Sequence, residues 1–275
     1  MDDPRERPAG DAEPDPGVAS VARIYDAYLD GTDHFPVDEE AAARVIARTP
    51  WAKPVARFNR AFMVRAVENA ARAGIGQIVD IGCGMPNDPS AFSAAWGVDP
   101  GILVVGFDND PMVVARGRSS ALASGRGTLL RGDVLDPWAI LEDLEPLVDW
   151  SRPVALVVTA VLQFIPDDRD PWGLLRVLRG PMAPGSRLVL SHSSTDGTAP
   201  EVVAGVEDAY QSATAQIKYR SDEQILAFFE GTTLLDPGLV AVQDWRPGPD
   251  RWAGEIPDVP GSVVRVAGAV GVLPA

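Results

Sequence analysis

The sequence has few of the side chains that build disulfides and transition-metal sites. Among its 275 residues are one cysteine, Cys83, and two histidines, His34 and His192. A single cysteine excludes an internal disulfide and a metal site made of several cysteines, and it is consistent with a reducing compartment. Cys83 lies within a glycine-rich turn, where we expect it to act as a small apolar filler. We expect no metal site.

The sequence also has fewer basic than acidic residues. The chain has 39 acidic and 24 basic residues, a formal net charge of -15, which repels polyphosphate backbones and anionic membrane surfaces. The longest apolar run, Val154–Leu162, is too short to cross a bilayer, and the amino terminus has no apolar segment typical of a secretion signal. We therefore expect a soluble, cytoplasmic protein with no nucleic-acid or membrane partner. The oligomeric state stays open.

Hydrophobic residues make up 46% of the chain, enough for one large core. Residues 1–17 are rich in proline, glycine and acids, and we expect them to form a flexible tail. Across residues 18–75 the apolar side chains recur at helical spacing, which predicts helices near 18–30, 39–47 and 51–73. These helices have too little apolar surface to fold alone, so we expect a helical lid on a single domain.

From Gln77 onward the pattern alternates between apolar strands and helices, which is typical of a parallel sheet with helices on both faces. We therefore predict a doubly wound α/β core over residues 76–275. The expected strands are 77–81, 102–107, 127–131, 154–160, 186–192, 238–243 and 262–271. The expected helices are 89–96, 111–124, 137–144, 171–182, 199–217 and 221–230.

The stretch QIVDIGCGMP, residues 77–86, ends the first expected strand in a Gly-x-Gly turn. Open α/β sheets bind their ligands at the carboxyl ends of the strands. Gly82 and Gly84 would let such a ligand approach the main chain closely. The stretch therefore predicts a nucleotide-type site, although a bare Gly-x-Gly does not say which ligand binds.

The residues after the glycines favour a cation over a phosphate. A dinucleotide site would have a third glycine and free N–H groups facing a pyrophosphate, whereas Pro86 and Pro89 have no N–H and Asp88 adds negative charge. S-adenosylmethionine (SAM) carries a sulfonium and an ammonium and no phosphate, so Asp80 and Asp88 would attract it. Alternatively, Asp88 only caps the following helix, with Pro89 at its first position.

Two further acids follow the second and third expected strands. Asp108, with Asn109 beside it, comes about two dozen residues after the glycines, where a carboxylate can accept both hydroxyls of a ribose. Asp133 can accept the adenine amino group while the N–H of Val134 meets the ring. Each acid could instead serve only a turn, but two acids at adjacent strand ends beside a Gly-x-Gly favour a SAM site.

The motifs VDIGCG, FDNDP, GDVLDP and VALVVTAVLQFIPDD together resemble those of the class I SAM-dependent methyltransferases. The segments RIYDAYLDGTDHF, RFNRAFMVRAV and LVLSHSS are similar, more narrowly, to the actinobacterial S-adenosyl methyltransferase family once catalogued as a domain of unknown function. The resemblance covers about residues 18–275. It implies a Rossmann-like, mostly parallel seven-stranded sheet with an antiparallel edge, covered by the helical amino-terminal lid.

The resemblance also implies the roles of individual residues in SAM binding. Thr159 or Ala160 would offer a carbonyl to the ammonium group, and Pro86 stands where many members have glycine or another small residue. The resemblance further implies that the methionine part of SAM contacts Asp80, Gly82 and Gly84. It implies that the ribose contacts Asp108 and that the adenine contacts Asp133 and Val134.

Catalytic and lid residues are less well marked in the sequence. His192 ends the fifth expected strand and is the candidate for a catalytic base, although a histidine there could simply form a hydrogen bond within a loop. Tyr25 and Tyr28 share one face of the first helix and could contact SAM or pack in the core.

We therefore expect a SAM-dependent methyltransferase acting on a small-molecule nucleophile by in-line displacement. One alternative is a SAM-binding protein without methyl transfer, such as a ligand sensor. The other is an NAD-dependent oxidoreductase, which the residues after the glycines disfavour.

Overall fold

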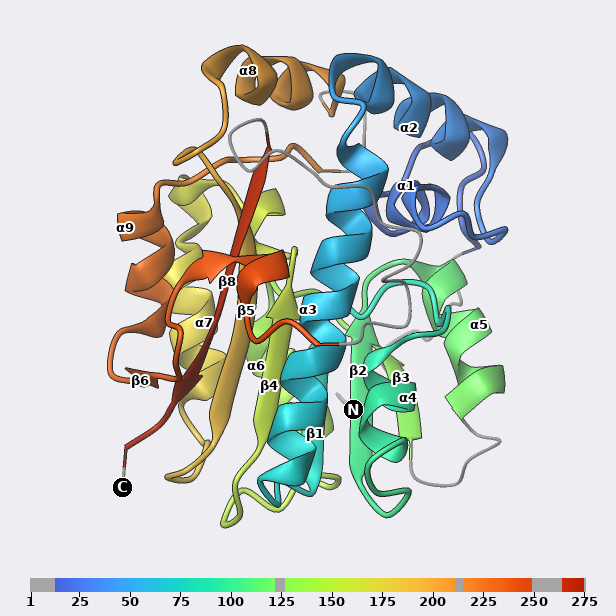
Figure 1. Cartoon of the computed structure of the whole chain (residues 1–275). Helices are drawn as coiled ribbons and strands as arrows, with labels where there is room; N and C mark the ends of the chain where they lie inside the picture. The colour runs from blue at the N-terminus through green and yellow to red at the C-terminus, as the bar shows by residue number, and fades with distance from the viewer. Residues whose placement is uncertain (1–12, 122–126, 211–214, 249–263, 275) are drawn as a thin grey trace.

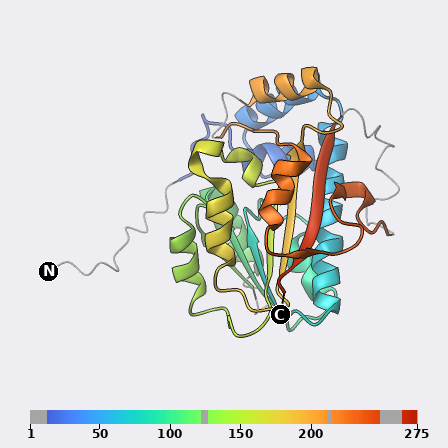
Figure 2. The same cartoon turned by 90° about the vertical axis from the view of Figure 1, so that its left-hand side faces the viewer.

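The computed structural model describes residues 13–121, 127–210, 215–248 and 264–274. A twisted sheet stands in the middle of the molecule, and α3 (Ala52–Arg72) crosses one of its faces (Figure 1). In the turned view, α7 (Pro171–Arg179), in yellow, and α3, in blue and cyan, lie on opposite sides of the sheet (Figure 2). The predicted doubly wound α/β architecture is confirmed.

Within the described residues the sheet has eight strands, in the order β3-β2-β1-β4-β5-β8-β6, with β7 also paired to β8. The first five strands in this order are parallel to one another, and β8 runs antiparallel to β5, β6 and β7. The strands are β1 (Gln77–Ile81), β2 (Leu103–Asp108), β3 (Gly127–Arg131), β4 (Ala155–Thr159), β5 (Arg187–Ser194), β6 (Thr233–Leu234), β7 (Val240–Ala241) and β8 (Arg265–Val272).

Side chains of the central strands alternate between two cores. Ile78 of β1 packs with α3 and α4, whereas Val79 and Ile81 pack with α6 and α7 on the other face. Because successive side chains of a strand point to opposite faces, Asp80 points toward the side of α3. The remaining helices are α1 (Val21–Tyr28), α2 (Pro36–Arg48), α4 (Ala91–Trp96), α5 (Pro111–Ala121), α6 (Pro137–Leu144), α8 (Pro200–Ala209) and α9 (Asp222–Leu226).

The amino-terminal helices do not behave as one unit. Phe62, Met63 and Val67 of α3 are buried against the sheet, and burial of each such side chain contributes about 1.5–3 kcal/mol. In contrast, α1 and α2 form a separate apolar cluster that also includes Val206 and Tyr210, within and just after α8. The packing therefore groups α3 with the sheet, and the cap over the sheet consists of α1, α2 and α8 (Figure 1).

Three local predictions are wrong. The sixth expected strand, 238–243, is reduced to β7, and β6 pairs with β8 where no strand was expected. Pro237 has no N–H to donate and the N–H of Gly238 donates to the Leu235 carbonyl, so this segment turns between its two short pairings. The sheet consequently has eight strands instead of seven.

The other two concern helices. Of the helix expected over 199–217, the described residues form α8, which ends at Ala209, and residues 211–214 lie outside them. Asp88 does not cap a helix, because α4 begins at Ala91 and its cap is Ser90, whose Oγ accepts a hydrogen bond from the Ser93 N–H at 3.2 Å. The expected strand 262–271 begins partly outside the described residues.

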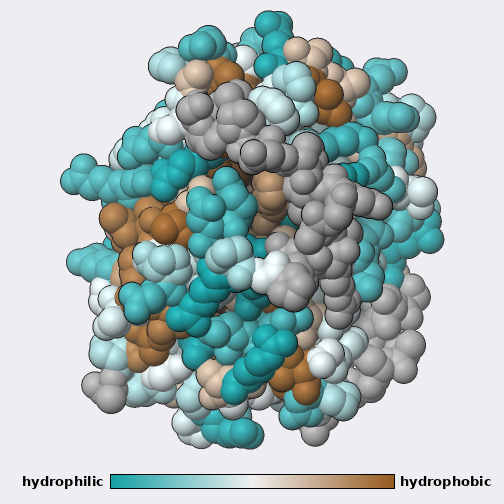
Figure 3. All heavy atoms as spheres, viewed as in Figure 1, coloured by the Kyte–Doolittle hydropathy of each residue, from teal (hydrophilic) through white to brown (hydrophobic). Residues whose placement is uncertain are grey.

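Few large hydrophobic side chains are exposed on the described part of the chain. On the face shown in Figure 3, the hydrophobic residues form small patches among hydrophilic ones. Among the described residues the large hydrophobic side chains that are exposed are Val18, Leu135, Trp138, Leu147 and Leu226. The described helices include none that is long and apolar enough to cross a membrane.

Candidate active site

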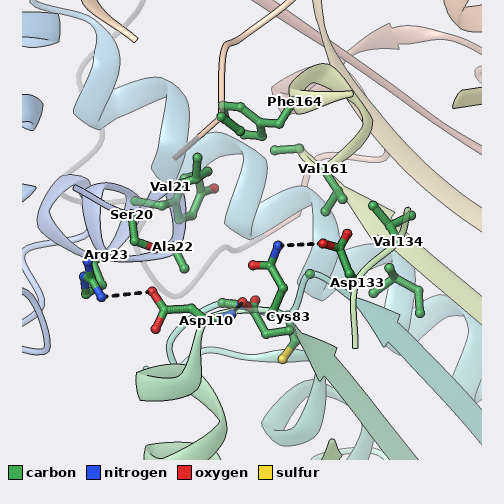
Figure 4. Close-up of a pocket in the computed structure, with 18 of the residues that line it drawn as sticks. Ser20, Val21, Ala22, Arg23, Cys83, Asp110, Asp133, Val134, Val161 and Phe164 are labelled. Carbon is green, nitrogen blue, oxygen red and sulfur yellow. Dashed lines mark hydrogen bonds and ion pairs between the residues drawn. The ribbon is translucent and has the colours of Figure 1, made fainter. Parts of the chain in front are cut away.

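A cavity of about 750 Å³ opens at the carboxyl ends of β1, β2, β3 and β4. Residues from the start of α1 form one wall, and residues after β3 and β4 form the opposite wall (Figure 4). The lining includes ten of the predicted site residues, namely Tyr25, Asp80, Gly82, Gly84, Asp108, Asn109, Asp133, Val134, Thr159 and Ala160. The fold therefore brings most of the predicted site together in one place.

The N–H groups of the glycine turn, residues 82–84, form hydrogen bonds within the protein. The N–H groups of Gly82 and Cys83 both donate to the Phe107 carbonyl, at 2.8 and 3.0 Å. The N–H of Gly84 donates to Oδ2 of Asp108 at 2.9 Å. Since Pro86 has no N–H, this turn does not offer the row of free donors that binds a pyrophosphate.

Glycine is required at both positions of the turn for conformational reasons. Gly82 and Gly84 each have a φ of +66°, in the left-handed region that other residues seldom adopt. A Cβ at Gly82 would lie 2.5 Å from Cγ2 of Val161, in the loop after β4, whereas a Cβ at Gly84 would meet nothing nearer than Arg60, at 3.9 Å. The β1 and β4 loops are therefore in direct contact at Gly82.

Two carboxylates lie deep in the cavity. Asp108 accepts hydrogen bonds from the N–H groups of Gly84 and Asp110. Burial nevertheless raises the pKa of Asp108 to about 6, although these hydrogen bonds work against the rise. Burial also raises the pKa of Asp80 to about 7, with the Arg60 cation lowering it and the Asp108 charge raising it further. A cation bound here would favour the ionised form of both groups.

The residues after β3 line the far side of the cavity. Oδ1 of Asp133 accepts the N–H of Leu135 at 3.0 Å. Its Oδ2 lies 3.5 Å from Nδ2 of Asn109, which follows β2 (Figure 4). Val134 is buried and presents an apolar surface beside this carboxylate. The arrangement places one hydrogen-bond acceptor and one apolar contact side by side.

The loop after β4 has a strained backbone at the cavity. Ala160 has a φ of +56°, a conformation that costs a residue other than glycine roughly 1–3 kcal/mol. Its N–H is held by Ser191, whose carbonyl and Oγ lie at 3.1 and 3.0 Å. Oγ of Ser191 in turn donates to Oδ1 of Asn59 at 2.6 Å. This network fixes the backbone of Thr159 and Ala160 where it borders the cavity.

Of the two tyrosines of α1, the structure brings only Tyr25 to the cavity. Its hydroxyl donates to the Ala56 carbonyl at 2.9 Å and accepts from Nδ2 of Asn59 at 3.0 Å. Tyr28 is not among the cavity residues, and its hydroxyl pairs with that of Tyr210 at 3.2 Å. The predicted SAM contact of Tyr28 is therefore corrected to packing between α1 and the end of α8.

The prediction of His192 as a catalytic base is also corrected. His192 is fully buried and does not border the cavity. Nη1 of Arg220 lies 2.7 Å from its Nε2, and its Nδ1 lies 2.8 Å from the Ser193 carbonyl. The arginine proton makes Nε2 the acceptor, so Nδ1 carries the ring hydrogen. Burial lowers the pKa of His192 to about 3, and it has no access to a substrate proton.

Several polar residues of the cavity were not predicted to bind SAM, among them Arg23, Asn59, Arg60 and Asp110. Arg23 is buried in α1 and forms ion pairs with Asp38 at 2.8 Å and with Asp110 at 3.3 Å. On α3, Asn59, Arg60 and Met63 lie three, four and seven residues after Ala56. This spacing places all four side chains on one buried face of the helix. Two polar residues on a helix face that is otherwise apolar are the sequence pattern that could have indicated Asn59 and Arg60.

Comparisons with known proteins agree on one family. The family model described as S-adenosyl methyltransferase matches residues 9–272. No curated protein matches the chain. Among solved structures, a DUF574 family protein from Streptomyces avermitilis is 35% identical with a TM-score of 0.86, and the match covers 94% of this chain and 98% of that one.

Two further structures extend the comparison. A predicted methyltransferase from Thermobifida fusca is 29% identical with a TM-score of 0.85, and the match covers 98% of this chain and all of that one (100%). An O-methyltransferase family protein from Burkholderia thailandensis shares the fold alone, at 14% identity and a TM-score of 0.55, over 86% of this chain and 59% of that one. The extent of the family match and the resemblance to the Streptomyces protein show that the chain belongs to the S-adenosyl methyltransferase family.

Proposed function

We propose that this SAM-dependent methyltransferase transfers the sulfonium methyl group to a small-molecule nucleophile by in-line displacement. The observation that supports the proposal most is the glycine turn. Its N–H groups donate inward, to Phe107 and Asp108, and two buried carboxylates, Asp80 and Asp108, border the same cavity. Such a site favours a positively charged nucleoside over a pyrophosphate.

We assign the parts of the cofactor by chemistry. Asp108 is the last residue of β2 and suits the two ribose hydroxyls. Asp133 and Asn109 offer polar groups to the edge of the adenine ring, with Val134 against its face. The methionine part would lie along the remaining predicted residues, Asp80, Gly82, Gly84, Thr159 and Ala160, with Tyr25 on the opposite wall.

The chain's own contribution to the reaction is alignment and exclusion of water. Bound SAM supplies an activated methyl group on its sulfonium. Val21, Val161 and Phe164 add apolar surface to the cavity, and a dry, shaped pocket that orients two reactants lowers the barrier of a displacement. The cap of α1 over the cavity favours a small acceptor over a polymer.

Two experiments test the proposal. In calorimetric titrations, SAM and its demethylated product S-adenosylhomocysteine (SAH) should bind, and NAD should not. In an assay with methyl-labelled SAM and a fractionated cell extract, label should move to a small molecule. Label that stays on SAM in every fraction would favour a SAM-binding sensor, and tight NAD binding would overturn the cofactor assignment.

A further inference from the structure

Arg60 of α3 is a buried cation whose role the cofactor assignments above leave open. Its side chain is 6% exposed and borders the cavity. Its guanidinium lies 5.7 Å from the centre of the Tyr25 ring. Among the described residues, no carboxylate lies within ion-pair distance of it and no oxygen accepts a hydrogen bond from it.

The other buried arginines near the cavity are paired. Arg23 forms ion pairs with Asp38 and Asp110. Arg220 bonds to Asp167 at 2.7 Å and to two backbone carbonyls. A guanidinium has five N–H donors, and Arg60, which borders the cavity, can direct its donors to a ligand there. A bound ligand with a negative group would pair with this charge.

The position of Arg60 identifies the end of the cofactor that it faces. Nη2 of Arg60 lies 3.9 Å from the point that a Cβ of Gly84 would occupy, and its charge lowers the pKa of Asp80 at the end of β1. Asp133 follows β3, two strands away in the sheet, roughly 10 Å at the usual strand spacing. With adenine beside Asp133 and ribose at Asp108, the amino-acid end of SAM extends toward Arg60.

We propose that Arg60 binds the carboxylate of the methionine moiety of SAM. A carboxylate matches the planar fork of a guanidinium through two parallel hydrogen bonds. Asp80, which points toward the side of α3, would face the ammonium group of the same moiety. Together, Arg60 and Asp80 would recognise the zwitterion of an α-amino acid. This inference rests on the proposed function, because it takes SAM as the occupant of the cavity.

The test compares ligands that differ at the amino-acid end. SAH has the carboxylate, SAH carboxamide has a neutral group in its place, and 5'-methylthioadenosine lacks the amino acid altogether. Wild-type protein should bind SAH roughly 10- to 100-fold more tightly than the carboxamide, the range expected for hydrogen bonds to a charged group. The Arg60→Met variant should lose that preference and bind methylthioadenosine as wild type does. Arg60→Lys should keep part of the preference.

Arg57→Met is the matched control, since it removes a cation three residues away on the same helix, where Arg57 pairs with Asp30 outside the cavity. It should leave all three affinities unchanged. If Arg60→Met weakens SAH and methylthioadenosine equally, or if wild type does not distinguish SAH from its carboxamide, Arg60 does not hold the carboxylate. If Arg60→Met fails to fold, a wild type that does not distinguish the two ligands still overturns the assignment, and Arg60→Lys takes the place of the methionine variant, with an unreduced preference in it counting against Arg60. A wild-type chain that binds none of these ligands would instead refute the proposed function, and this assignment with it.

Discussion

Asp108 has two roles at the residue scale, because one carboxylate fixes the glycine turn and faces the cavity. It accepts the N–H groups of Gly84 and Asp110, and it has further lone pairs for a ligand. We predict that Asp108→Ala weakens SAM binding by about 1–3 kcal/mol through the loss of ribose hydrogen bonds. Calorimetric titration measures the change, with the exposed Asp168→Ala as control. An unchanged affinity would contradict the ribose assignment.

The two glycines of the turn allow backbone strain to be separated from steric overlap. Both have a φ of +66°, but only a Cβ at Gly82 meets Val161 at 2.5 Å. Alanine in the left-handed region costs about 1–2 kcal/mol, so Gly84→Ala should lower the free energy of unfolding by about that amount. Gly82→Ala should lower it by more. Denaturant unfolding without ligand tests this, and equal losses would show that the overlap relaxes freely.

The acids of the site could be predicted from the sequence, and His192 could not be placed correctly. Asp80, Asp108 and Asp133 lie within two residues of the carboxyl end of a parallel strand, and such ends meet at one edge of the sheet. His192 also stands near a strand end, but β5 continues to Ser194 and pairs with β8 along its whole length. Arg220, which is distant in the sequence, then covers the imidazole. The spacing of residues in the sequence does not reveal this contact between Arg220 and His192.

At the scale of elements, α1 is fastened over the cavity by Arg23. The guanidinium lies 2.8 Å from Asp38 and 3.3 Å from Asp110, and all three side chains are almost fully buried. Removing one partner of a buried pair typically costs about 3–5 kcal/mol. We therefore predict that Arg23→Met loosens α1, exposes it to limited proteolysis and weakens SAM binding.

Arg48→Met is the control for this prediction. Arg48 pairs with Asp208 at 3.9 Å, and both side chains are more than half exposed, at 61% and 64%, so its loss should change stability by less than about 0.5 kcal/mol. If the two variants are cleaved at the same rate and both bind SAM as wild type does, Arg23 does not hold the cap in place.

The elements that the sequence predicted well are those with a strong local pattern. The five parallel strands are apolar runs bounded by turns, and each is found close to its expected position. The short pairings of β6 and β7 lack such a pattern, since each strand has two residues and depends on β8 for its hydrogen bonds. Likewise, the helical spacing of α3 does not reveal that most of its buried side chains pack against the sheet, while Ala56 packs with α1 and α2.

At the scale of the whole molecule, buried titrating groups make stability depend on pH in two opposite ways. Asp80 has a pKa of about 7, against 3.8 when unperturbed. Between these two pH values the folded state keeps a proton on Asp80 that the unfolded state loses. The resulting contribution to folding stability is fully present below pH 3.8 and is lost as the pH rises through 7. His192 has a pKa of about 3, against 6.5. Its contribution is present above pH 6.5 and is lost as the pH falls toward 3.

We predict that Asp80→Asn removes the part of the alkaline loss that Asp80 causes, while Asp108, whose pKa burial raises to about 6, keeps its own part. In thermal unfolding without ligand, the variant should gain in Tm relative to wild type as the pH rises from about 5 to 8, since it has no carboxyl at position 80 to ionise. Asp168→Asn, at an exposed position, should follow wild type throughout. A difference between Asp80→Asn and wild type that is constant over this range would show that Asp80 does not titrate there.

The charge of the cavity lining also bears on how a reaction cycle ends. Among the described residues that line it, six are acids and three are arginines: Glu13, Asp15, Asp80, Asp108, Asp110, Asp133, Arg23, Arg60 and Arg131. Methyl transfer turns a sulfonium into a neutral thioether, so the attraction between this acidic lining and the sulfur disappears in the same step. With SAM bound as proposed, the reaction removes this contribution to cofactor binding, and its loss favours product release.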